Sequence, residues 1–534
     1  MATASLPGTM TGGEALVAAL VDHGVEVVFG IPGTHNLEIY KHLALRGVRH
    51  VSTRHEQGAG YAADGYARTT GKVGVAVVTS GPALLNAATA VAQAWSDSVP
   101  VLVVSPGLPL RHPATGNGLL HETRDQGAAL RAVCAASLRA TSVAEIPTTV
   151  AQAFALMTAG RPRPVHLEVP LDVLEETAEV AAVAPVPQAT PMPSERSLAD
   201  AAVRLEGARR PVLIVGGGAK RAATEVRELA ERLGAPVVTT INGKGVLPED
   251  HELALGAGVH LPAVRALVEE ADVVVAIGTE LAPADLWYGP LPVAGKLVRV
   301  DIDPVGAVTN ATAETVLLGD AAVTLRELTK RLGRTPAEPD VAAWRERKRS
   351  DARREGAEWT ALTDAMGPAL PRDAILSTDN AMACYYGAMA NVATHTPASF
   401  LFPTGYGTLG YGLPAAIGAK VGNPDRPVVA MLGDGGVMFT VQELATAAVL
   451  GIALPVVVVD NSGYGEIRNE MVERHDPVHA VDFPAPDFAA LGRALGCHGV
   501  SVDDPADVTA AIETALRADR PTVIHVRMPE GVTA

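Results

Sequence analysis

The stretch Val428-Val-Ala-Met-Leu-Gly-Asp-Gly-Gly436 is an apolar run that ends in a glycine turn, and the segment after it, Val441–Val449, has a helical period. Continuous rather than alternating hydrophobicity indicates a strand buried on both faces, as in a parallel sheet covered by helices. The same pattern recurs along the chain at Val73–Thr79, Val99–Ser105, Val212–Val215, Val273–Ile277 and Leu454–Val459. The sequence therefore predicts an α/β fold.

Two proline-rich stretches divide the chain. Residues 185–193 read Pro-Val-Pro-Gln-Ala-Thr-Pro-Met-Pro, and residues 334–340 read Arg-Thr-Pro-Ala-Glu-Pro-Asp. Repeated proline disfavours both a helix and a central strand, so we predict linkers at these places. They separate three doubly wound parallel-sheet domains of ordinary size, at residues 1–184, 195–333 and 341–534.

The composition argues against several kinds of partner. The 534-residue chain has 43 Lys and Arg against 59 Asp and Glu, and its formal charge of -16 opposes binding to nucleic acid or an anionic membrane. No apolar stretch approaches the length of a membrane span, and Met1–Gly13 lacks the pattern of a signal peptide. Cys134, Cys384 and Cys497 are dispersed, as expected in a reducing compartment. We therefore predict a cytoplasmic protein without nucleic-acid or membrane partners.

Two strand ends carry oxygen ligands suited to a metal. Asp434 follows the strand at 428–432, and Asn461 follows the next apolar run, 27 residues later. Glycines let the backbone approach a phosphate, and carboxylate and amide oxygens suit magnesium. A single Gly-Asp-Gly is more often a turn with a capping Asp. The second turn, at 460–465, favours a functional site at the shared edge of the sheet.

This pair of turns resembles the thiamine-diphosphate signature. The chain is thereby identified as a member of the acetolactate synthase and pyruvate decarboxylase superfamily. The resemblance implies that Asp434, Asn461 and the carbonyl of Gly463 hold Mg²⁺, which clamps the diphosphate. Many members have Asn-Asn where this chain has Asp460-Asn461, but the liganding second position is retained. The other residues expected at the diphosphate are Gly435, Gly436, Tyr464 and Gly465.

The segment Arg54–Arg68 is rich in small residues, which suits a helix packed tightly against another surface, and Glu56 lies near its start. The helix dipole alone also favours a Glu in a first turn. In the thiamine-diphosphate family this segment carries the Glu that hydrogen-bonds the aminopyrimidine ring and promotes loss of the thiazolium proton. The resemblance implies this catalytic role for Glu56, since a desolvated carboxylate can share a proton with a ring nitrogen.

Further motifs resemble the walls of the cofactor pocket. The segment Gly405–Ala419 looks like the family segment that holds the cofactor bent. The resemblance implies that Leu409 lies under the bend and that the carbonyl of Gly407 meets the pyrimidine amino group. Pro32 and Asn86 match positions that line the pyrimidine pocket.

These matches follow the family order of a pyrimidine-binding domain, a central domain and a diphosphate-binding domain. In the family, the residues matching Glu56 and Asp434 meet across a subunit interface, so the resemblance implies a homodimer or homotetramer with active sites at subunit interfaces. Flavin binding is not expected, because Ala257–Pro262 and Glu280–Pro283 depart from the stretches with which acetolactate synthases hold FAD.

Several departures from the family concern the substrate. His121 stands where acetolactate synthases usually have Gln at the reaction centre. It is either a catalytic His that protonates or orients the enamine intermediate, or a loop His satisfied by the backbone. Thr34 and His35 are expected at the same mouth. Glu466 and Glu470 lie four residues apart, on one face of a helix if the segment is helical. They are either a solvated face paired with arginines or a receptor for a substrate cation such as a guanidinium.

The nearest resemblance is to the acetolactate-synthase-like branch that includes 5-guanidino-2-oxopentanoate decarboxylase. It rests on the segments 29–40, 120–122 and 463–468. It implies thiamine-diphosphate- and Mg-dependent decarboxylation of a 2-oxo acid through an enamine intermediate. The alternatives are a carboligase that forms acetohydroxy acids or acyloins from pyruvate, and a catalytically silent regulatory relative.

Overall fold

The structure is a computed structural model, and it describes residues 8–112, 116–185, 189–333 and 335–528. The chain divides into two compact units. One contains Met1–Ala189, Gly405–Pro424 and Thr440–Gly451, and the other contains Thr190–Thr404, Asp425–Phe439 and Ile452–Ala534. Parts of both predicted linkers (186–188 and 334) and of the chain start (1–7) lie outside the described residues. The domain boundaries at 184, 195, 333 and 341 stay a prediction.

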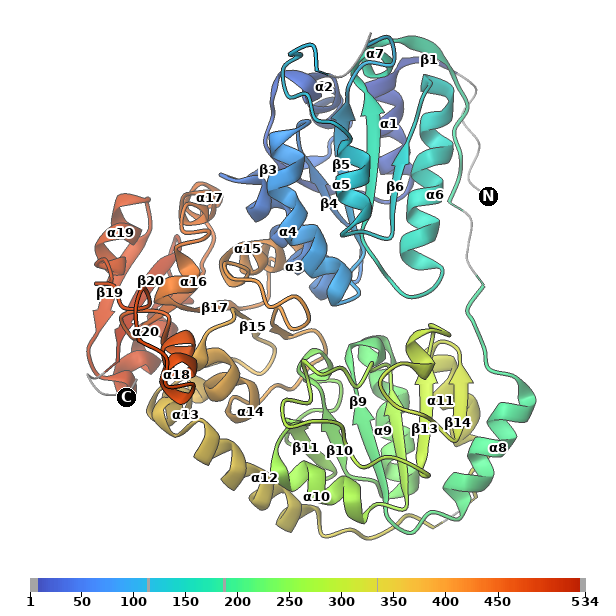
Figure 1. The fold of residues 1–534 in the computed structure, drawn as a ribbon, viewed down its shortest axis with the longest axis vertical. Coiled ribbons are helices and arrows are strands. Elements are labelled where there is room, and N and C mark those ends of the chain that lie inside the picture. Colours follow the sequence, from blue (N-terminus) through green and yellow to red (C-terminus); the bar gives the residue numbers. More distant parts are fainter. Residues whose placement is uncertain (1–7, 113–115, 186–188, 334, 529–534) are drawn as a thin grey trace. The chain divides into compact units, whose positions relative to one another are not determined.

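The first unit is built on a parallel sheet (Figure 1), and its strand order is β3-β2-β4-β5-β7-β6. The order reverses between β2 and β4, and parallel sheets bind ligands beyond the carboxyl ends of the strands at such a point. The strands are β2 (Val27–Gly30), β3 (Arg49–Ser52), β4 (Gly74–Val77), β5 (Val101–Gly107), β6 (Ala136–Arg139) and β7 (Val165–Pro170), with an antiparallel pair of β1 (Gly8–Thr11) and β8 (Thr177–Val180).

The helices of this unit come from distant parts of the chain. They are α1 (Gly12–Asp22), α2 (Leu37–Leu45), α3 (Glu56–Thr70), α4 (Pro82–Ser96), α5 (Gln126–Arg131), α6 (Ile146–Thr158), α7 (Leu171–Glu175), α15 (Gly412–Gly422) and α17 (Glu443–Leu450).

Helices α3 and α15 touch through their backbones. A methyl group at Gly65 would lie 2.1 Å from the carbonyl oxygen of Ala415, and one at Gly418 would lie 1.9 Å from that of Ala62. Only glycine fits such contacts. The small residues of the segment 54–68 are therefore explained by a tight helix contact, as predicted.

The second unit contains two parallel sheets. The central sheet has the order β11-β10-β9-β12-β13-β14, and its chain reversal lies beside β9. Its strands are β9 (Pro211–Val215), β10 (Val237–Thr239), β11 (Ala254–Ala257), β12 (Val273–Ile277), β13 (Leu297–Asp301) and β14 (Thr315–Leu318), and its helices are α8 (Glu195–Glu206), α9 (Ala223–Leu233), α10 (Pro262–Glu270) and α11 (Ala321–Thr329).

The last sheet has the order β16-β15-β17-β18-β20-β19, so its chain connections repeat those of the first sheet. Its reversal lies between β15 and β17. The strands are β15 (Ile375–Thr378), β16 (Phe400–Leu401), β17 (Val428–Gly433), β18 (Pro455–Asp460), β19 (His498–Val502) and β20 (Thr522–Arg527). The helices are α12 (Val341–Glu355), α13 (Thr360–Ala369), α14 (Met389–Asn391), α16 (Asp434–Val437), α18 (Gly465–Glu473), α19 (Phe488–Ala494) and α20 (Val508–Ala515).

These sheets confirm the predicted fold class of three doubly wound, parallel α/β domains. The apolar runs that predicted this fold, such as 428–432 and 273–277, are buried parallel strands. None of the described helices is both long and apolar enough to cross a membrane.

Candidate active site

The carboxyl edge of the last sheet gathers the predicted metal ligands. Asp434 opens α16 directly after β17, and Asn461 and Gly463 follow the neighbouring strand β18. The backbone amide of Gly435 donates to Asp434 Oδ1 at 2.8 Å, and that of Gly463 donates to Oδ2 at 2.9 Å. These bonds hold the Asp434 carboxylate at the point where the strand order reverses.

The three predicted ligands lie at the spacing that a small cation requires. One end of the Asn461 side-chain amide is 3.1 Å from both Asp434 Oδ1 and the carbonyl oxygen of Gly463. With Oδ1 at this end, three oxygen acceptors face one another, whereas Nδ2 there would donate to both. A cation stabilises the first orientation, because adjacent ligands of octahedral magnesium, each at about 2.1 Å from it, lie about 3 Å apart. The residues present therefore fit Mg²⁺.

The Asp434 carboxyl group is buried, so a nearby positive charge would stabilise its ionised form. Its exposed fraction is 2%. Burial, together with the nearby carboxylate of Asp460, raises the pKa of Asp434 to about 7. A bound cation would stabilise the ionised form. Among the described residues no cluster of three or more His, Cys, Asp or Glu is placed to hold a metal, and this set differs because it combines one carboxylate with an amide and a carbonyl.

Asp460 has a different role from its neighbour Asn461. Its Oδ2 lies 2.9 Å from Nε2 of the buried His525, and its Oδ1 accepts from the backbone amide of Ser462 at 2.9 Å. Although burial opposes ionisation, these contacts hold the pKa of Asp460 below its usual value. Asp460 therefore braces the turn that carries Asn461.

Three glycines at this edge stand where a side chain would collide with a neighbouring group. A methyl group at Gly435 would lie 2.6 Å from the Tyr464 ring, and one at Gly465 would lie 2.6 Å from Asn461 Nδ2. Gly463 has φ +149°, and a methyl group there would lie 2.1 Å from the carbonyl oxygen of Val481. Gly435 and Gly436 are buried in α16, so four of the predicted cofactor residues lie within one turn of the metal ligands.

The carboxyl edge of the first sheet holds the other predicted cofactor residues. Glu56 is the first residue of α3, after β3, and is half-buried. Asn86 of α4, after β4, donates from Nδ2 to Glu56 Oε2 at 3.0 Å. Pro32 lies exposed in the turn after β2. Because β3, β2 and β4 are neighbours, these residues share one edge.

Glu443 is a residue of this site that the sequence did not reveal. It is fully buried in α17, and its Oε1 accepts from the backbone amides of Arg54 and His55, each at 3.0 Å. Burial raises the pKa of Glu443 despite these bonds. The carboxylate fixes the turn immediately before Glu56. The available signal was a single Glu in α17, whose other residues are apolar apart from Thr446.

The segment 405–411 is attached to α3. The hydroxyls of Thr408 and Tyr61 are 2.6 Å apart, and Tyr411 donates to Asp64 Oδ1 at 2.6 Å. Between these anchors, Gly407 is exposed with φ +68°, and Leu409 is half-buried. The structure thus brings the predicted bend residues and the Glu56 helix into one unit.

The predicted substrate residues His35 and His121 both lie next to Ser80, which was not predicted. His35 Nδ1 lies 2.6 Å from Ser80 Oγ, and His121 Nδ1 lies 3.5 Å from the same atom. Burial, and next the proximity of His121, hold the pKa of His35 below its usual value. Thr34, the residue before His35, is exposed. No pattern of residues singles out Ser80.

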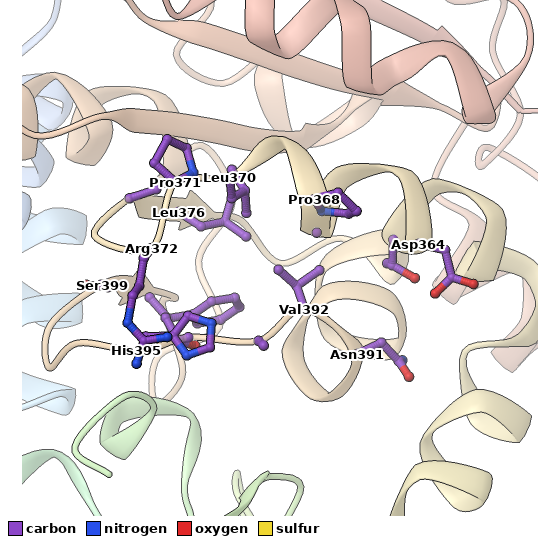
Figure 2. Close-up of a pocket in the computed structure, with 16 residues that line it drawn as sticks. Asp364, Pro368, Leu370, Pro371, Arg372, Leu376, Asn391, Val392, His395 and Ser399 are labelled. Atoms are coloured by element: carbon purple, nitrogen blue, oxygen red, sulfur yellow. The ribbon is translucent and has the colours of Figure 1, made fainter. Parts of the chain in front are cut away.

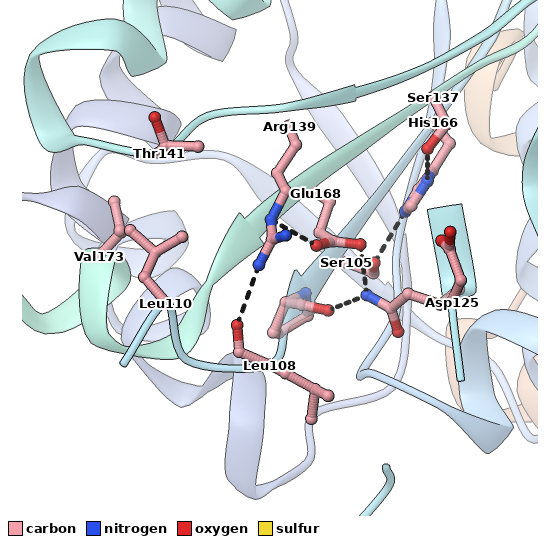
Figure 3. A network of polar contacts seen from close by, with 12 residues as sticks. Ser105, Leu108, Leu110, Asp125, Ser137, Arg139, Thr141, His166, Glu168 and Val173 are labelled. Atoms are coloured by element: carbon pink, nitrogen blue, oxygen red, sulfur yellow. Dashed lines mark hydrogen bonds and ion pairs between the residues drawn. The ribbon is translucent and has the colours of Figure 1, made fainter. Parts of the chain in front are cut away.

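A buried polar network supports this group (Figure 3). Gln126 Oε1 accepts from the amide of Gly81 at 3.2 Å, and its Nε2 donates to the carbonyl of Pro106 at 2.7 Å and to Glu168 Oε2 at 2.9 Å. Glu168 Oε1 in turn pairs with Arg139 at 2.9 Å. Gln126 therefore ties the turn that carries Ser80 to the rigid strands β5 and β7.

We expect Gln126→Leu to destabilise the protein by about 2 to 3 kcal/mol, because it leaves buried donors and acceptors without partners. Thermal unfolding of the cofactor-free protein measures the change. Gln152→Leu, an exposed position on α6, should change stability by less than about 0.5 kcal/mol. Equal melting temperatures for Gln126→Leu and the parent would contradict this role for Gln126.

The two predicted substrate carboxylates, Glu466 and Glu470, lie in different environments. Glu466, in the first turn of α18, is half-buried, and its Oε1 accepts from the Tyr386 hydroxyl at 3.0 Å. The Tyr385 hydroxyl lies close enough that, besides burial, the Glu466 charge raises its pKa. Glu470 has a side chain that is 59% exposed, and Arg474 lies 4.0 Å away. Only Glu466 has the sheltered setting of a binding group.

The two tyrosines beside Glu466 pack against a third aromatic ring. Burial, and next the Glu466 charge, raise the pKa of both Tyr385 and Tyr386, so both hydroxyls stay protonated donors. Their ring centroids are 4.6 Å apart, and the Trp287 ring is nearly perpendicular to each of them. The tyrosines lie on a π-helical turn, Ala383–Ala388, a feature found often at functional sites.

A cavity of about 370 Å³ lies elsewhere in the second unit (Figure 2). Its lining comes from α13 and the segments 370–376 and 391–400. At its ends, Arg372 is paired with Asp250 and Asp364 with Arg353. Because these charges are already neutralised and no predicted site residue lines it, we do not place catalysis there.

Comparison with known protein families gives a match for each of the three predicted domains. The chain matches the family models for the thiamine pyrophosphate enzyme N-terminal TPP binding domain at residues 10–128, the central domain at 198–328 and the C-terminal TPP binding domain at 381–526. The chain belongs to the thiamine pyrophosphate enzyme family. This confirms the predicted enzyme class, a thiamine-diphosphate-dependent 2-oxo acid decarboxylase or carboligase.

The similar proteins include a probable decarboxylase and two acetolactate synthases. The chain is 46% identical over 523 residues to the "Probable 2-ketoarginine decarboxylase AruI" of Pseudomonas aeruginosa, covering 96% of this chain and 92% of that protein. It is 36% identical to an acetolactate synthase large subunit of Parasynechococcus marenigrum (99% and 89% covered) and 34% identical to an acetolactate synthase of Mycobacterium avium (97% and 87% covered).

Proposed function

We propose that this enzyme uses thiamine diphosphate and Mg²⁺ to decarboxylate 5-guanidino-2-oxopentanoate, the 2-oxo acid that corresponds to arginine. The observation that carries the proposal is the sheltered carboxylate of Glu466, which accepts a hydrogen bond from the Tyr386 hydroxyl and lies close to Tyr385. The identity of 46% to a protein named as a probable 2-ketoarginine decarboxylase supports the same substrate.

The cofactor would be held at the two sheet edges. In the proposal, Asp434, Asn461 and the carbonyl of Gly463 bind Mg²⁺, and the amides of Gly435 and Gly436, with Tyr464 and Gly465, lie against the diphosphate. Thiamine diphosphate, when bound, supplies a nucleophilic carbon and an electron sink for loss of CO₂. The proposal includes no flavin.

Glu56 is the residue assigned to proton transfer with the cofactor's aminopyrimidine ring. Its carboxylate is oriented by Asn86, and the turn before it is fixed by the buried Glu443. Such bracing reduces the motion that would misplace a proton. Leu409, the carbonyl of Gly407 and Pro32 are assigned to the walls that hold the ring.

The guanidinium of the substrate would meet Glu466. Tyr386 orients the carboxylate but leaves it acceptor capacity, and a planar guanidinium can bond a carboxylate through two N–H groups. The tyrosine rings offer faces for cation–π contact. A neutral 2-oxo acid would leave the carboxylate without its partner, which costs binding energy.

The assembly we propose is a homodimer or homotetramer with active sites at subunit interfaces. Glu56 and Asp434 lie in different compact units of the chain, and the proposal pairs each with its counterpart on another subunit. The three cysteines are free thiols, which supports a cytoplasmic location.

Carboligation is the second candidate, because acetolactate synthases match the chain at 34 to 36% identity over nearly its whole length. The deciding experiment supplies thiamine diphosphate, magnesium and a panel of 2-oxo acids, and measures CO₂, aldehyde and coupled product together. Aldehyde from 5-guanidino-2-oxopentanoate supports the proposal. Acetolactate or acyloin from pyruvate without free aldehyde would favour carboligation, and no CO₂ from any acid would indicate a silent relative.

We expect Glu466→Leu to lower kcat/KM for 5-guanidino-2-oxopentanoate about 10- to 100-fold, the value of one hydrogen bond to a charged group. Activity on a branched aliphatic 2-oxo acid should fall far less. Glu473→Leu, an exposed position at the end of the same helix, is the matched control, and Glu470→Leu measures the second carboxylate separately. Equal losses on both substrates would remove the case for a cationic substrate.

A further inference from the structure

Ser80 lies between two imidazoles in the first unit. Its hydroxyl oxygen is 2.6 Å from His35 Nδ1 and 3.5 Å from His121 Nδ1, and the two rings meet edge to face with centroids 5.0 Å apart. Ser80 is 2% exposed, while both histidines are half-buried. A hydroxyl can accept from one imidazole while it donates to the other, so the three side chains form a continuous path for a proton.

The backbone is shaped to bring these groups together. His121 has φ +63°, and Gly81, next to Ser80, has φ +61°. A methyl group at Gly81 would lie 2.4 Å from the carbonyl oxygen of His121. Non-glycine residues with positive φ are uncommon and occur often at functional sites. Gln126 secures the Gly81 amide from the other side.

The group also lies at the correct edge of the sheet. His35 follows β2, Ser80 follows β4 and His121 follows β5, and these strands are neighbours in the order β2-β4-β5. Glu56 follows β3, on the other side of β2. The three side chains therefore lie along the carboxyl edge that carries the proposed cofactor base.

We propose that His35, Ser80 and His121 form a proton relay that supplies the hydrogen replacing the lost carboxylate, and so directs the reaction to aldehyde release. This inference rests on the proposed decarboxylation. In each turnover a C–C bond breaks, CO₂ leaves and one proton is added to the carbon that keeps the electron pair. His121 gives a proton from Nε2 and regains one at Nδ1 from Ser80, which takes its replacement from His35, and His35 takes one from solvent.

The relay can be tested first without cofactor. In ¹⁵N-histidine-labelled protein, the Nδ1 resonance of His35 should show a hydrogen bond that is lost in Ser80→Ala and restored in Ser80→Thr. Thr79→Val is the matched control, since the neighbouring Thr79 hydroxyl has no hydrogen-bond partner in the described structure and valine keeps its shape. Identical His35 spectra in Ser80→Ala and Thr79→Val would overturn the relay.

Activity and product ratio form the second arm. Ser80→Ala should slow aldehyde formation about 100-fold and raise the share of coupled product when an acceptor aldehyde is present. His35→Gln combined with Ser80→Ala should be no slower than the slower single variant, because both interrupt one path. Multiplying losses, or an unchanged aldehyde rate, would overturn the relay. Absence of CO₂ release by the parent enzyme would instead refute the proposed function, and the spectra would still decide the hydrogen bonds.

Discussion

Glu56→Gln is expected to lower kcat about 10²- to 10⁴-fold, the usual contribution of a positioned acid or base, while cofactor affinity changes little. Glutamine keeps an oxygen that can accept the Asn86 hydrogen bond, so the side chain should stay in place. It cannot exchange a proton with a ring nitrogen at neutral pH. Steady-state kinetics and calorimetric titration of cofactor into the cofactor-free protein measure the two effects separately.

The control for this substitution is Glu26→Gln, a surface position whose side chain is 66% exposed and pairs with Lys72. It removes one carboxylate from the same unit and should leave kcat unchanged. Wild-type turnover by Glu56→Gln would rule out the assignment. A large fall in cofactor affinity with unchanged kcat at saturation would assign Glu56 to binding rather than to proton transfer.

Asp434→Asn is expected to weaken magnesium binding at least about 100-fold, since even residues outside the ligand shell change metal affinity by 10 to 100 times. The amide lacks the negative charge, and its NH₂ group would face a backbone amide donor at Gly435 or Gly463. Cofactor binding should then require correspondingly more magnesium. Titration calorimetry with magnesium at fixed thiamine diphosphate gives the affinity.

Asp460→Asn provides the comparison, because it removes the adjacent carboxylate but leaves the three oxygens in place. We expect its magnesium affinity to fall only about tenfold, the low end of the effect of a residue outside the ligand shell, because the bond to His525 that braces the Asn461 turn weakens. Magnesium affinities that are equal in Asp434→Asn and the parent would show that the metal, if bound, is held elsewhere.

The fold was predictable because its evidence is local. A buried parallel strand such as 428–433 needs a continuous apolar run whatever it packs against, and a glycine turn after it is equally local. Asp434, Asn461 and Glu56 could be proposed as site residues because each stands at a recognisable strand end or helix start. Their neighbours alone were not enough, and the predicted roles came from the resemblance of these turns to the family motifs.

Residues that act through tertiary contacts were missed. Glu443 reaches the turn at 54–55 from a segment nearly four hundred positions later, and Ser80 and Gln126 gain their roles only when separate loops meet. No spacing rule links such side chains. The same limit applies to Glu466 and Glu470. Their spacing predicts that both side chains lie on one face of a helix, but it does not predict that only Glu466 lies beside Tyr385 and Tyr386.

The backbone contact of α3 with α15 sets a constraint on biosynthesis. The first unit includes residues 405–424 and 440–451, so a ribosome must make 451 residues before that unit can close. Translation of the intervening chain takes on the order of tens of seconds. During this interval the glycine-lined face of α3 lacks its partner, and such non-local closure folds slowly and favours aggregation. Truncation before residue 405 would leave α3 without the helix that packs against it.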